Sequence, residues 1–304
     1  MAMRHKAFSM QGFTIAFSRT VVGISASAAM RLPGRASAKR ISMGILSPIR
    51  LAATAVAATI FIACAHAEQP QQLKLTIGTE GGYPPFNSVA PDGSLVGFDI
   101  DIAKALCAEM RADCTFVTQA WQGVIPALQA GRFDAIISMA VTSERKGKVD
   151  FTHAYYHSVP AIAVPKSSAI AGVTPEDLKG KSLGVQEGTV HFRYAKEKYK
   201  ESDIRKYPAI AGYEHDLADG TLDAAMDGRF VLENWLKTEA GQCCRILGTL
   251  KPDPAIHGEG VAIAVRRGDT DLVNRFNAAI AAIRTDGTYK RINDKYFDFD
   301  IYGG

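Results

Sequence analysis

Acidic residues are absent from the first 67 positions of this 304-residue chain, which carry eight Lys or Arg. This stretch ends in the apolar run LAATAVAATIFIACAHA, residues 51–67. The run is short for a membrane span, which needs about 20 apolar residues. A basic residue, an apolar region and an end of small residues are together typical of a secretory signal peptide. We therefore expect residues 1–67 to be a leader and the mature chain to begin near Glu68.

The leader is longer than a simple signal peptide. Residues 43–67 alone form one of ordinary length, so we predict a true start at Met43. An organellar transit peptide is an alternative, because the stretch is rich in Arg and Ser. A lipoprotein anchor at Cys64 is another, although Phe61 stands where such signals usually have Leu. N-terminal sequencing of the exported protein would distinguish these possibilities.

The positive charge of the chain is confined to its leader. The whole sequence has 35 Lys and Arg against 31 Asp and Glu. Without the first 67 residues it has 27 (35 − 8) against 31, a net charge near −4. This balance gives no support for a nucleic-acid-binding surface. We expect no nucleic-acid partner.

Cysteine is scarce, and four of the five cysteines lie after the leader. Export implies an oxidising compartment, where cysteines pair. Cys107 and Cys114 bracket a short segment between an expected helix and an expected strand, a natural place for a disulfide. Cys243 and Cys244 are adjacent, and their state is left open. A zinc site is the alternative, but C-x6-C with C-C is poor ligand spacing, so we predict no metal.

Strand and helix patterns alternate through the rest of the chain, in two similar units. This β-α-β alternation predicts an α/β fold of parallel sheets with helices on both faces, and a crevice between two lobes. The expected strands are residues 73–78, 114–119, 133–138, 161–165, 182–188, 203–208, 221–226 and 261–265, and the expected helices are 98–110, 121–131, 175–180, 189–199, 212–220, 229–241, 270–287 and 288–297.

Residues with binding chemistry follow these strands. In such sheets, ligands bind at the carboxyl ends of the parallel strands. The set is Glu80 and Tyr83, then Trp121, then the loop from Ser138 to Arg145, then Gln186 to His191 at a helix start, then Asp227 and Arg229. It comprises acids, aromatics, an Arg and a hydroxyl at a helix N-terminus, and so suits a zwitterion with an extra positive charge.

Each group has a matching part of such a ligand. An Arg fork and a helix N-terminus hold a carboxylate. Two aromatic faces sandwich an alkyl or guanidinium chain, and an acid at the end of that slot meets a distal cation. Taken singly, Glu80 also fits a solvated turn acid, Tyr83 and Trp121 fit core residues, and Arg145 fits an exposed charge run. Their shared position at strand ends favours the binding interpretation.

The chain from about residue 73 to 304 resembles the periplasmic solute-binding proteins of polar amino-acid ABC transporters. Within them it is most similar to the lysine/arginine/ornithine and octopine/nopaline binders. The stretches that carry the resemblance are LKLTIGTEGGYPPFN, GSLVGFDIDIAKALC, VIPALQAGRFDAIIS, VTSERKGKVDFTHAYY, LKGKSLGVQEGT and RTDGTYKRINDKYFDFDIYG.

The resemblance implies a two-lobed periplasmic-binding-protein fold of type II, with two hinge crossover strands and a ligand cleft. Lobe 1 would comprise residues 68–158 with 259–304, and lobe 2 residues 159–258. It further implies a periplasmic monomer without a cofactor. Such a protein would capture arginine, lysine, ornithine or an opine and deliver it to an inner-membrane permease.

Family roles carry over onto matching positions. Tyr83 and Trp121 match the aromatic slot, and Glu80 matches the acid that meets the distal cation. Arg145 matches the carboxylate clamp, and the loop that contacts the α-amino and carboxylate groups holds Ser138, Met139, Ala140 and Thr142. Thr189 matches the second-lobe hydroxyl in a loop with Gln186 and His191, and Cys107 with Cys114 matches a family disulfide.

Three departures from the family pattern bear on the ligand. The loop after DAII is one residue shorter than usual, and Ala140 stands where Ser is common. The position of the second-lobe acid holds Gly228, so the contact to the α-amino group is assigned to Asp227 beside it. His191 replaces a frequent Gln, which hints at an altered ligand.

Two rival functions remain. Dehydratases of the cyclohexadienyl or arogenate type share this fold and act on prephenate-like diacids. Glu80 and Asp227 argue against such a ligand, and no nucleophile–base pair is apparent, so we predict a binding protein and not an enzyme. A sensory domain is the third option, but no later membrane span or signalling domain is expected. Sequence alone does not rank the basic amino acids and opines.

Overall fold

The computed structural model describes residues 72–303. The predicted signal peptide, the start at Met43 and the possible anchor at Cys64 lie outside this range. Within residues 72–303, no helix is both long enough and apolar enough to cross a membrane. Over the same range, no group of three His, Cys, Asp or Glu side chains is placed to hold a metal ion.

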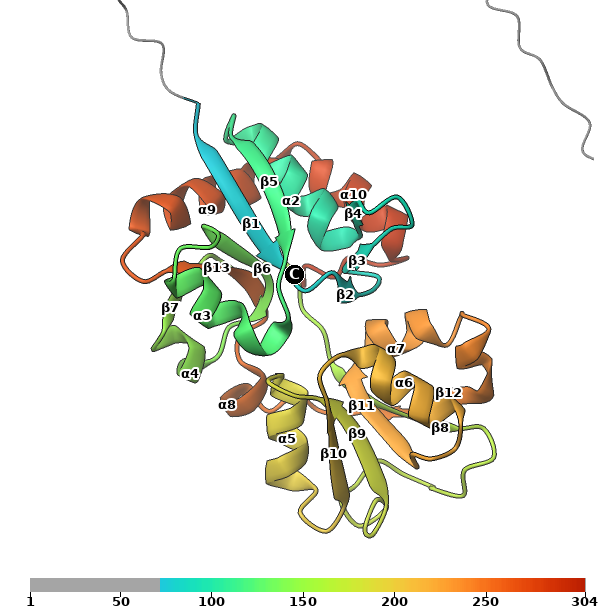
Figure 1. Ribbon diagram of the computed structural model, residues 1–304. Coiled ribbons are helices and arrows are strands. Elements are labelled where there is room, and N and C mark those ends of the chain that lie inside the picture. The colour runs from blue at the N-terminus through green and yellow to red at the C-terminus, as the bar shows by residue number, and fades with distance from the viewer. Residues whose placement is uncertain (1–71, 304) are drawn as a thin grey trace, which may run out of the picture. The chain divides into compact units, whose positions relative to one another are not determined.

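The first of two five-stranded sheets has the order β5-β1-β6-β13-β7, and β2, β3 and β4 form a separate three-stranded sheet (Figure 1). Strands β5, β1 and β6 run parallel, whereas β13 is antiparallel to both of its neighbours. Leu75 and Ile77 alternate along β1 and are buried, as expected for a strand with one face on the core. The strands are β1 (Lys74–Thr79), β5 (Asp113–Thr118), β6 (Ala135–Ala140), β7 (Val149–Phe151) and β13 (Val261–Arg266).

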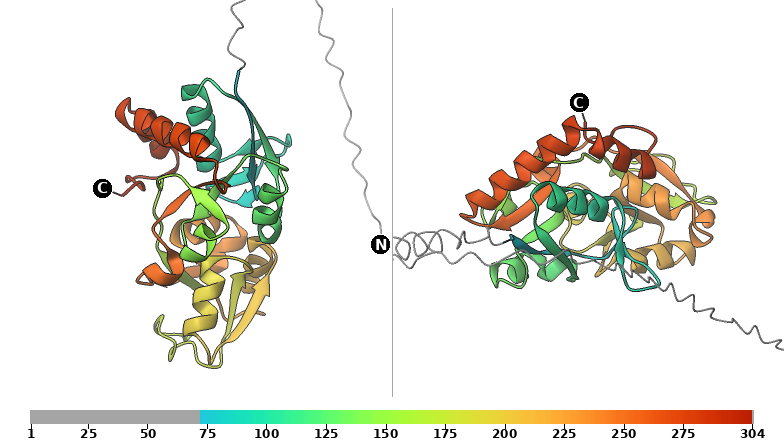
Figure 2. Two further views of the ribbon diagram at one scale, coloured as in Figure 1. Left: turned by 90° about the vertical axis from the view of Figure 1, so that its left-hand side faces the viewer. Right: turned by 90° about the horizontal axis from the view of Figure 1, so that it is seen from above.

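Helices cover both faces of this sheet. Phe98, Ile102 and Leu106 recur at four-residue steps and are fully buried, so α2 presents one apolar stripe to the core. Helices α9 and α10, from the end of the chain, pack beside α2 (Figure 2). Helix α3 packs with Ile136 on the opposite face from Ile137. The elements are α2 (Phe98–Glu109), η2 (Trp121–Gly123), α3 (Val124–Gln129), α9 (Thr270–Thr285) and α10 (Thr288–Tyr296).

The second sheet has the order β10-β9-β11-β8-β12, with β10, β9 and β11 parallel and β8 antiparallel to β11 and β12. Every residue of β9 and β11 is buried, which is typical of central strands covered on both faces. Its elements are β8 (Pro160–Pro165), β9 (Ser182–Gln186), α5 (Val190–Lys198), β10 (Asp203–Tyr207), α6 (Ile210–Ala218), β11 (Ala224–Gly228), α7 (Arg229–Trp235), η3 (Ala240–Cys243) and β12 (Cys244–Thr249).

Three details of the expected secondary structure were wrong. Residues 175–180 form turns and not a helix. Both sheets are mixed, because the strands that return after each crossover run antiparallel. The sequence patterns also missed short elements that carry few apolar residues, together with β7 and β12. The short elements are β2 (Gly82–Tyr83), β3 (Asn87–Val89), β4 (Leu95–Val96), α4 (Ser143–Lys146) and α8 (Pro254–His257).

Cys107, near the end of α2, is bonded to Cys114 on β5, as predicted. The structure also joins the adjacent Cys243 and Cys244, whose state the sequence had left open.

Two lobes, each built on a mixed five-stranded sheet with helices, are the observed fold class. The residue limits of the lobes stay a proposal. We use 68–158 with 259–304 for lobe 1 and 159–258 for lobe 2.

Candidate functional site

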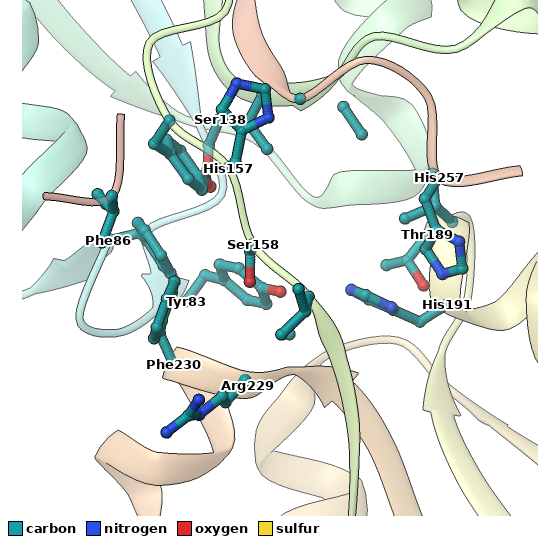
Figure 3. Close-up of a pocket in the computed structure, with 18 of the residues that line it drawn as sticks. Tyr83, Phe86, Ser138, His157, Ser158, Thr189, His191, Arg229, Phe230 and His257 are labelled. Carbon is teal, nitrogen blue, oxygen red and sulfur yellow. Dashed lines mark hydrogen bonds between the residues drawn. The ribbon is translucent and has the colours of Figure 1, made fainter. Parts of the chain in front are cut away.

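A cavity of about 480 Å³ is lined by residues at the ends of β1, β6, β9 and β11 (Figure 3). Tyr83 and Phe230 lie on one side, His191 and His257 lie on the other, and Ser158 lies between them. Two crossover segments connect the sheets, one from β7 to β8 and the other from β12 to β13. Residues of both segments and of the chain's end also contribute to the wall. The wall thus combines side chains from both sheets, as a ligand site between two α/β units would.

Most of the predicted ligand residues are part of this wall, and three are not. Met139, Thr142 and Asp227 lie outside it. The Thr142 hydroxyl caps α4, because it accepts the Arg145 N–H at 3.2 Å. The residues in the wall are Glu80, Tyr83, Trp121, Ser138, Ala140, Arg145, Gln186, Thr189 and His191.

Met139 does not face this cavity because side chains alternate along β6. It is buried and packs with Val124, Leu128 and Ala264 in the core beneath α3. Its neighbours Ser138 and Ala140 point the other way and reach the cavity. The structure therefore gives Met139 a packing role, contrary to the prediction.

Asp227 is also withdrawn from the cavity, with only 1% of its surface exposed. Its carboxylate accepts hydrogen bonds from the Tyr83 hydroxyl, from the Tyr213 hydroxyl at 2.7 Å and from the Gly228 N–H at 2.6 Å. Since a carboxylate offers about four acceptor positions, three strong donors leave little for a ligand. The next residue, Gly228, is the one in the wall. The predicted contact between Asp227 and an α-amino group is therefore corrected.

Glu80 lies at the turn after β1, where Gly81 adopts a positive φ of 76° that a side chain would disfavour. The Gln186 amide donates a hydrogen bond to the Glu80 carboxylate. Burial raises the pKa of Glu80 to about 7, although the bond from Gln186 opposes the rise; the charge of Asp227 adds to it. A cationic partner would stabilise the ionised form of this buried carboxyl.

Arg145 is buried in the short helix α4, which follows β6, and its guanidinium lies 5.5 Å from the centre of the Trp121 ring. Its Nη atoms donate to two backbone carbonyls, of Ala140 at 3.1 Å and Gly188 at 3.0 Å. Burial lowers the pKa of Arg145 to about 10, which still leaves it charged at neutral pH. A buried cation whose partners are neutral carbonyls is suited to a ligand carboxylate.

Ser138 has the left-handed φ of 74°, which is unusual for a residue other than glycine. Strand β6 carries one extra residue here, opposite a register shift in β13. The Tyr155 hydroxyl accepts the Ser138 N–H at 3.0 Å and donates to buried Asp99 at 2.6 Å. The Ser138 hydroxyl lies 3.2 Å from the Tyr156 hydroxyl. These bonds fix a strained residue at the cavity wall, which is typical of binding sites.

Thr189 is the N-cap of α5. Its hydroxyl accepts the Phe192 N–H at 3.0 Å and donates to the Gln186 carbonyl at 2.7 Å. Its one proton is therefore already used, so it cannot donate to a ligand. The free N–H groups at the start of α5 remain as donors for an anion.

Sequence reasoning missed the wall residues that come from the crossover segments and the end of the chain. Tyr156 and Ser158 lie between β7 and β8, and His257 ends α8 before β13. None of them follows a parallel strand, and none matches a position whose family role was carried over. Gly228 was noticed in the sequence only as a departure from the family pattern.

Comparisons with known proteins show the family of this chain. The family of bacterial extracellular solute-binding proteins, family 3, matches residues 75–299. An L-arginine-binding protein of Pseudomonas aeruginosa is 46% identical over 231 residues, or 75% of this chain and 89% of that protein. The lysine/arginine/ornithine-binding periplasmic protein of Escherichia coli is 35% identical over 245 residues, or 79% and 93%. The structure of an ancestral arginine-binding protein bound to arginine has a TM-score of 0.68 at 35% identity, over 74% and 98%.

Proposed function

Since the chain belongs to the bacterial extracellular solute-binding proteins, family 3, we propose that it captures a cationic amino acid or a derivative of one. Arginine, lysine, ornithine and opines form the candidate class. The observation that carries this proposal is the presence of Arg145 and Glu80 in one cavity wall. One is a buried cation without a carboxylate partner among the described residues, and the other is an acid whose pKa is raised by burial.

The proposed ligand lies between these two charges. Its carboxylate pairs with Arg145 and with the N–H groups at the start of α5. Its side chain runs between Tyr83 and Trp121 and brings its cation to Glu80, whose ionised form it stabilises. The α-carboxylate and the distal cation are thus recognised by separate parts of the cavity wall.

Closure of the lobes would be the signal that an ABC permease reads. Five hydrogen bonds support a closed arrangement, because each joins residues of the two proposed lobes. Two of them join Tyr83 to Asp227 and Gln186 to Glu80. The Gly188 carbonyl accepts two more, from the Trp121 ring N–H at 3.2 Å and from Arg145 at 3.0 Å. In the fifth, the Gln122 amide donates to the Pro208 carbonyl at 3.1 Å. We propose a periplasmic monomer that needs no cofactor.

Substitution of Glu80 tests the proposal. In calorimetric titrations, Glu80→Gln should weaken the binding of arginine, lysine and ornithine by at least tenfold, while glutamine affinity changes much less. The Gln variant keeps the size of the side chain and its contact with Gln186. An equal loss for cationic and neutral ligands would show that Glu80 is not the charge partner.

An enzyme on the same fold is the rival function. A prephenate-like diacid would need more than one free cation in the wall, and Glu80 would repel it. A turnover assay with prephenate and arogenate should show no product above the rate of a buffer control. Turnover that depends on Glu80 would replace the binding function with a catalytic one.

A further inference from the structure

Asp99 lies in the first turn of helix α2 and does not line the cavity, and its side chain is fully buried. Its carboxylate accepts hydrogen bonds from two neutral side chains, the Asn87 amide at 3.0 Å and the Tyr155 hydroxyl at 2.6 Å. Burial raises the pKa of Asp99, and the bonds from Tyr155 and Asn87 oppose the rise. A buried charge is costly even when it is hydrogen-bonded, so an apolar residue would serve packing alone better.

The Asn87 side chain connects Asp99 to the turn that carries Glu80. Its amide donates to one oxygen of Asp99, and its carbonyl oxygen accepts the Gly81 N–H at 2.9 Å. That N–H belongs to the peptide that joins Glu80 to Gly81, so this bond fixes the plane from which the Glu80 side chain departs. We call the two hydrogen bonds from Gly81 through Asn87 to Asp99 the Asn87 relay.

The Tyr155 side chain connects the other oxygen of Asp99 to strand β6. Its hydroxyl donates to Asp99 and accepts the N–H of Ser138, the residue with the left-handed φ. Two positions further along β6, the Ala140 carbonyl accepts a hydrogen bond from Arg145 at 3.1 Å. We call the two hydrogen bonds from Ser138 through Tyr155 to Asp99 the Tyr155 relay.

Both relays run in one direction, from a backbone N–H to the carboxylate. Each therefore needs an acceptor at its end, and an ionised carboxylate is the side chain with two acceptor oxygens and no donor. Asp99→Asn would turn an NH2 group toward one of the two donors, so one relay would lose its acceptor. The chemistry of this position thus depends on the charge of Asp99 and not only on its shape.

We propose that Asp99 is a positioning residue, which holds the Glu80 turn and the Ser138 segment in the one arrangement that fits both charged ends of the ligand. It acts through Asn87 and Tyr155 and does not contact the ligand itself. The inference rests on the proposed function, because it presumes that Glu80 and Arg145 hold the distal cation and the carboxylate.

A double-mutant cycle measured by calorimetry tests this role. The probe is whichever of arginine, lysine, ornithine and octopine binds the unaltered protein most tightly. In that protein, Glu80→Gln should weaken binding at least tenfold. Asp99→Asn should by itself weaken binding at least tenfold, and in its background Glu80→Gln should cost less than threefold, because Glu80 no longer meets the cation. A residue that only stabilises the fold would leave the cost of Glu80→Gln unchanged.

Asp101 provides a matched control in the same turn of α2. Its carboxylate accepts hydrogen bonds from Lys295 at 3.1 Å and from the Tyr296 hydroxyl at 3.0 Å, both in helix α10. Asp101→Asn removes the same charge from the same helix end but leaves both relays intact. In its background, Glu80→Gln should keep its full tenfold cost.

Two further variants break one relay each, and they serve as the test should Asp99→Asn fail to fold. Asn87→Ala breaks the Asn87 relay, so it should reduce the cost of Glu80→Gln and leave the cost of Arg145→Met unchanged. Tyr155→Phe keeps the buried ring but breaks the Tyr155 relay, so it should have the opposite effect. A general loss of stability would not separate the two ends of the ligand in this way.

The possible failures are distinguishable. Equal costs of Glu80→Gln in the Asp99→Asn and Asp101→Asn backgrounds overturn this inference and leave the proposed function standing. Costs of Glu80→Gln and Arg145→Met that stay unchanged in both Asn87→Ala and Tyr155→Phe overturn it as well. No binding of any of the four probes by the unaltered protein, or no effect of Glu80→Gln on that protein, overturns the proposed function and this inference together.

Discussion

The Tyr83 hydroxyl donates a hydrogen bond to the Asp227 carboxylate, which lies 144 positions later in the chain. The same carboxylate accepts a second hydroxyl, that of Tyr213 on the adjacent helix α6. Tyr213 and Asp227 belong to one proposed lobe, whereas Tyr83 belongs to the other. The Asp227 carboxylate therefore links residues of the two proposed lobes.

Removal of the Tyr83 hydroxyl should weaken ligand binding without loss of the aromatic wall. Tyr83→Phe removes one hydrogen bond to a charged acceptor, a contribution of about 1.5–3 kcal/mol, so affinity should fall roughly tenfold or more. Tyr213→Phe is the matched control, because its bond to Asp227 lies within one lobe. It should lower the free energy of unfolding but change affinity little. Equal losses of affinity in the two variants would contradict the linking role of Tyr83.

Arg145 should matter for binding more than for stability. Arg145→Met removes the proposed carboxylate partner, at a cost of about 2–5 kcal/mol in binding, so affinity should fall by at least 30-fold. Because the charge is buried without a carboxylate, its loss should leave the melting temperature of the ligand-free protein unchanged or higher. Arg275→Ala, which breaks an exposed pair with Asp271, should change neither quantity. Unchanged affinity in Arg145→Met would rule out the clamp.

The affinity for cationic ligands should rise with pH. Burial raises the pKa of Glu80 to about 7, and only its ionised form pairs with a cation. Protonation therefore competes with the ligand, and affinity should fall by up to about tenfold per pH unit below this pKa and level off above it. Titrations from pH 5 to pH 9 measure the slope.

Two variants identify the group that causes this slope. Glu80→Gln should abolish it between pH 6 and pH 8. Glu214, outside the cavity wall, has a pKa that burial also raises to about 7. Glu214→Gln should therefore keep the slope. A slope that vanished in Glu214→Gln and survived in Glu80→Gln would show that Glu214, and not Glu80, causes the pH dependence of binding.

The disulfide between Cys107 and Cys114 should stabilise the fold and leave the site unaffected. It closes a short loop between α2 and β5, seven positions apart, for which chain entropy predicts about 2.5 kcal/mol. The double variant Cys107→Ser, Cys114→Ser should lose roughly this much in urea unfolding. Its affinity for ligand should stay within twofold, since neither residue lines the cavity. A large loss of affinity at full folding would contradict a purely structural role.

Much of the site could be predicted from the sequence because parallel strands bring their carboxyl ends together. That rule alone selected Glu80, Tyr83, Trp121, Arg145 and Gln186, which all lie in one cavity wall. The same apolar periodicities gave most helices and central strands, since these are buried on one stripe or on both faces.

What failed depended on single-residue register. Gly228 lines the cavity whereas Asp227, the residue before it on β11, is buried behind the wall, and spacing in the sequence does not say which of the two lines the cavity. Side-chain alternation likewise separates Met139 from Ser138 on β6. Ser158 and His257 lie on crossover segments, whose position depends on how the two sheets are assembled. Such contacts follow from tertiary structure and leave no local pattern.

Calorimetric titration of the purified protein with cationic ligands and with glutamate tests the central claim most directly. The account predicts saturable binding of at least one of arginine, lysine, ornithine or octopine, and none of glutamate. Tight binding of glutamate, with no heat from any cationic ligand, would contradict the assignment of Arg145 and Glu80 to the two ends of a basic amino acid.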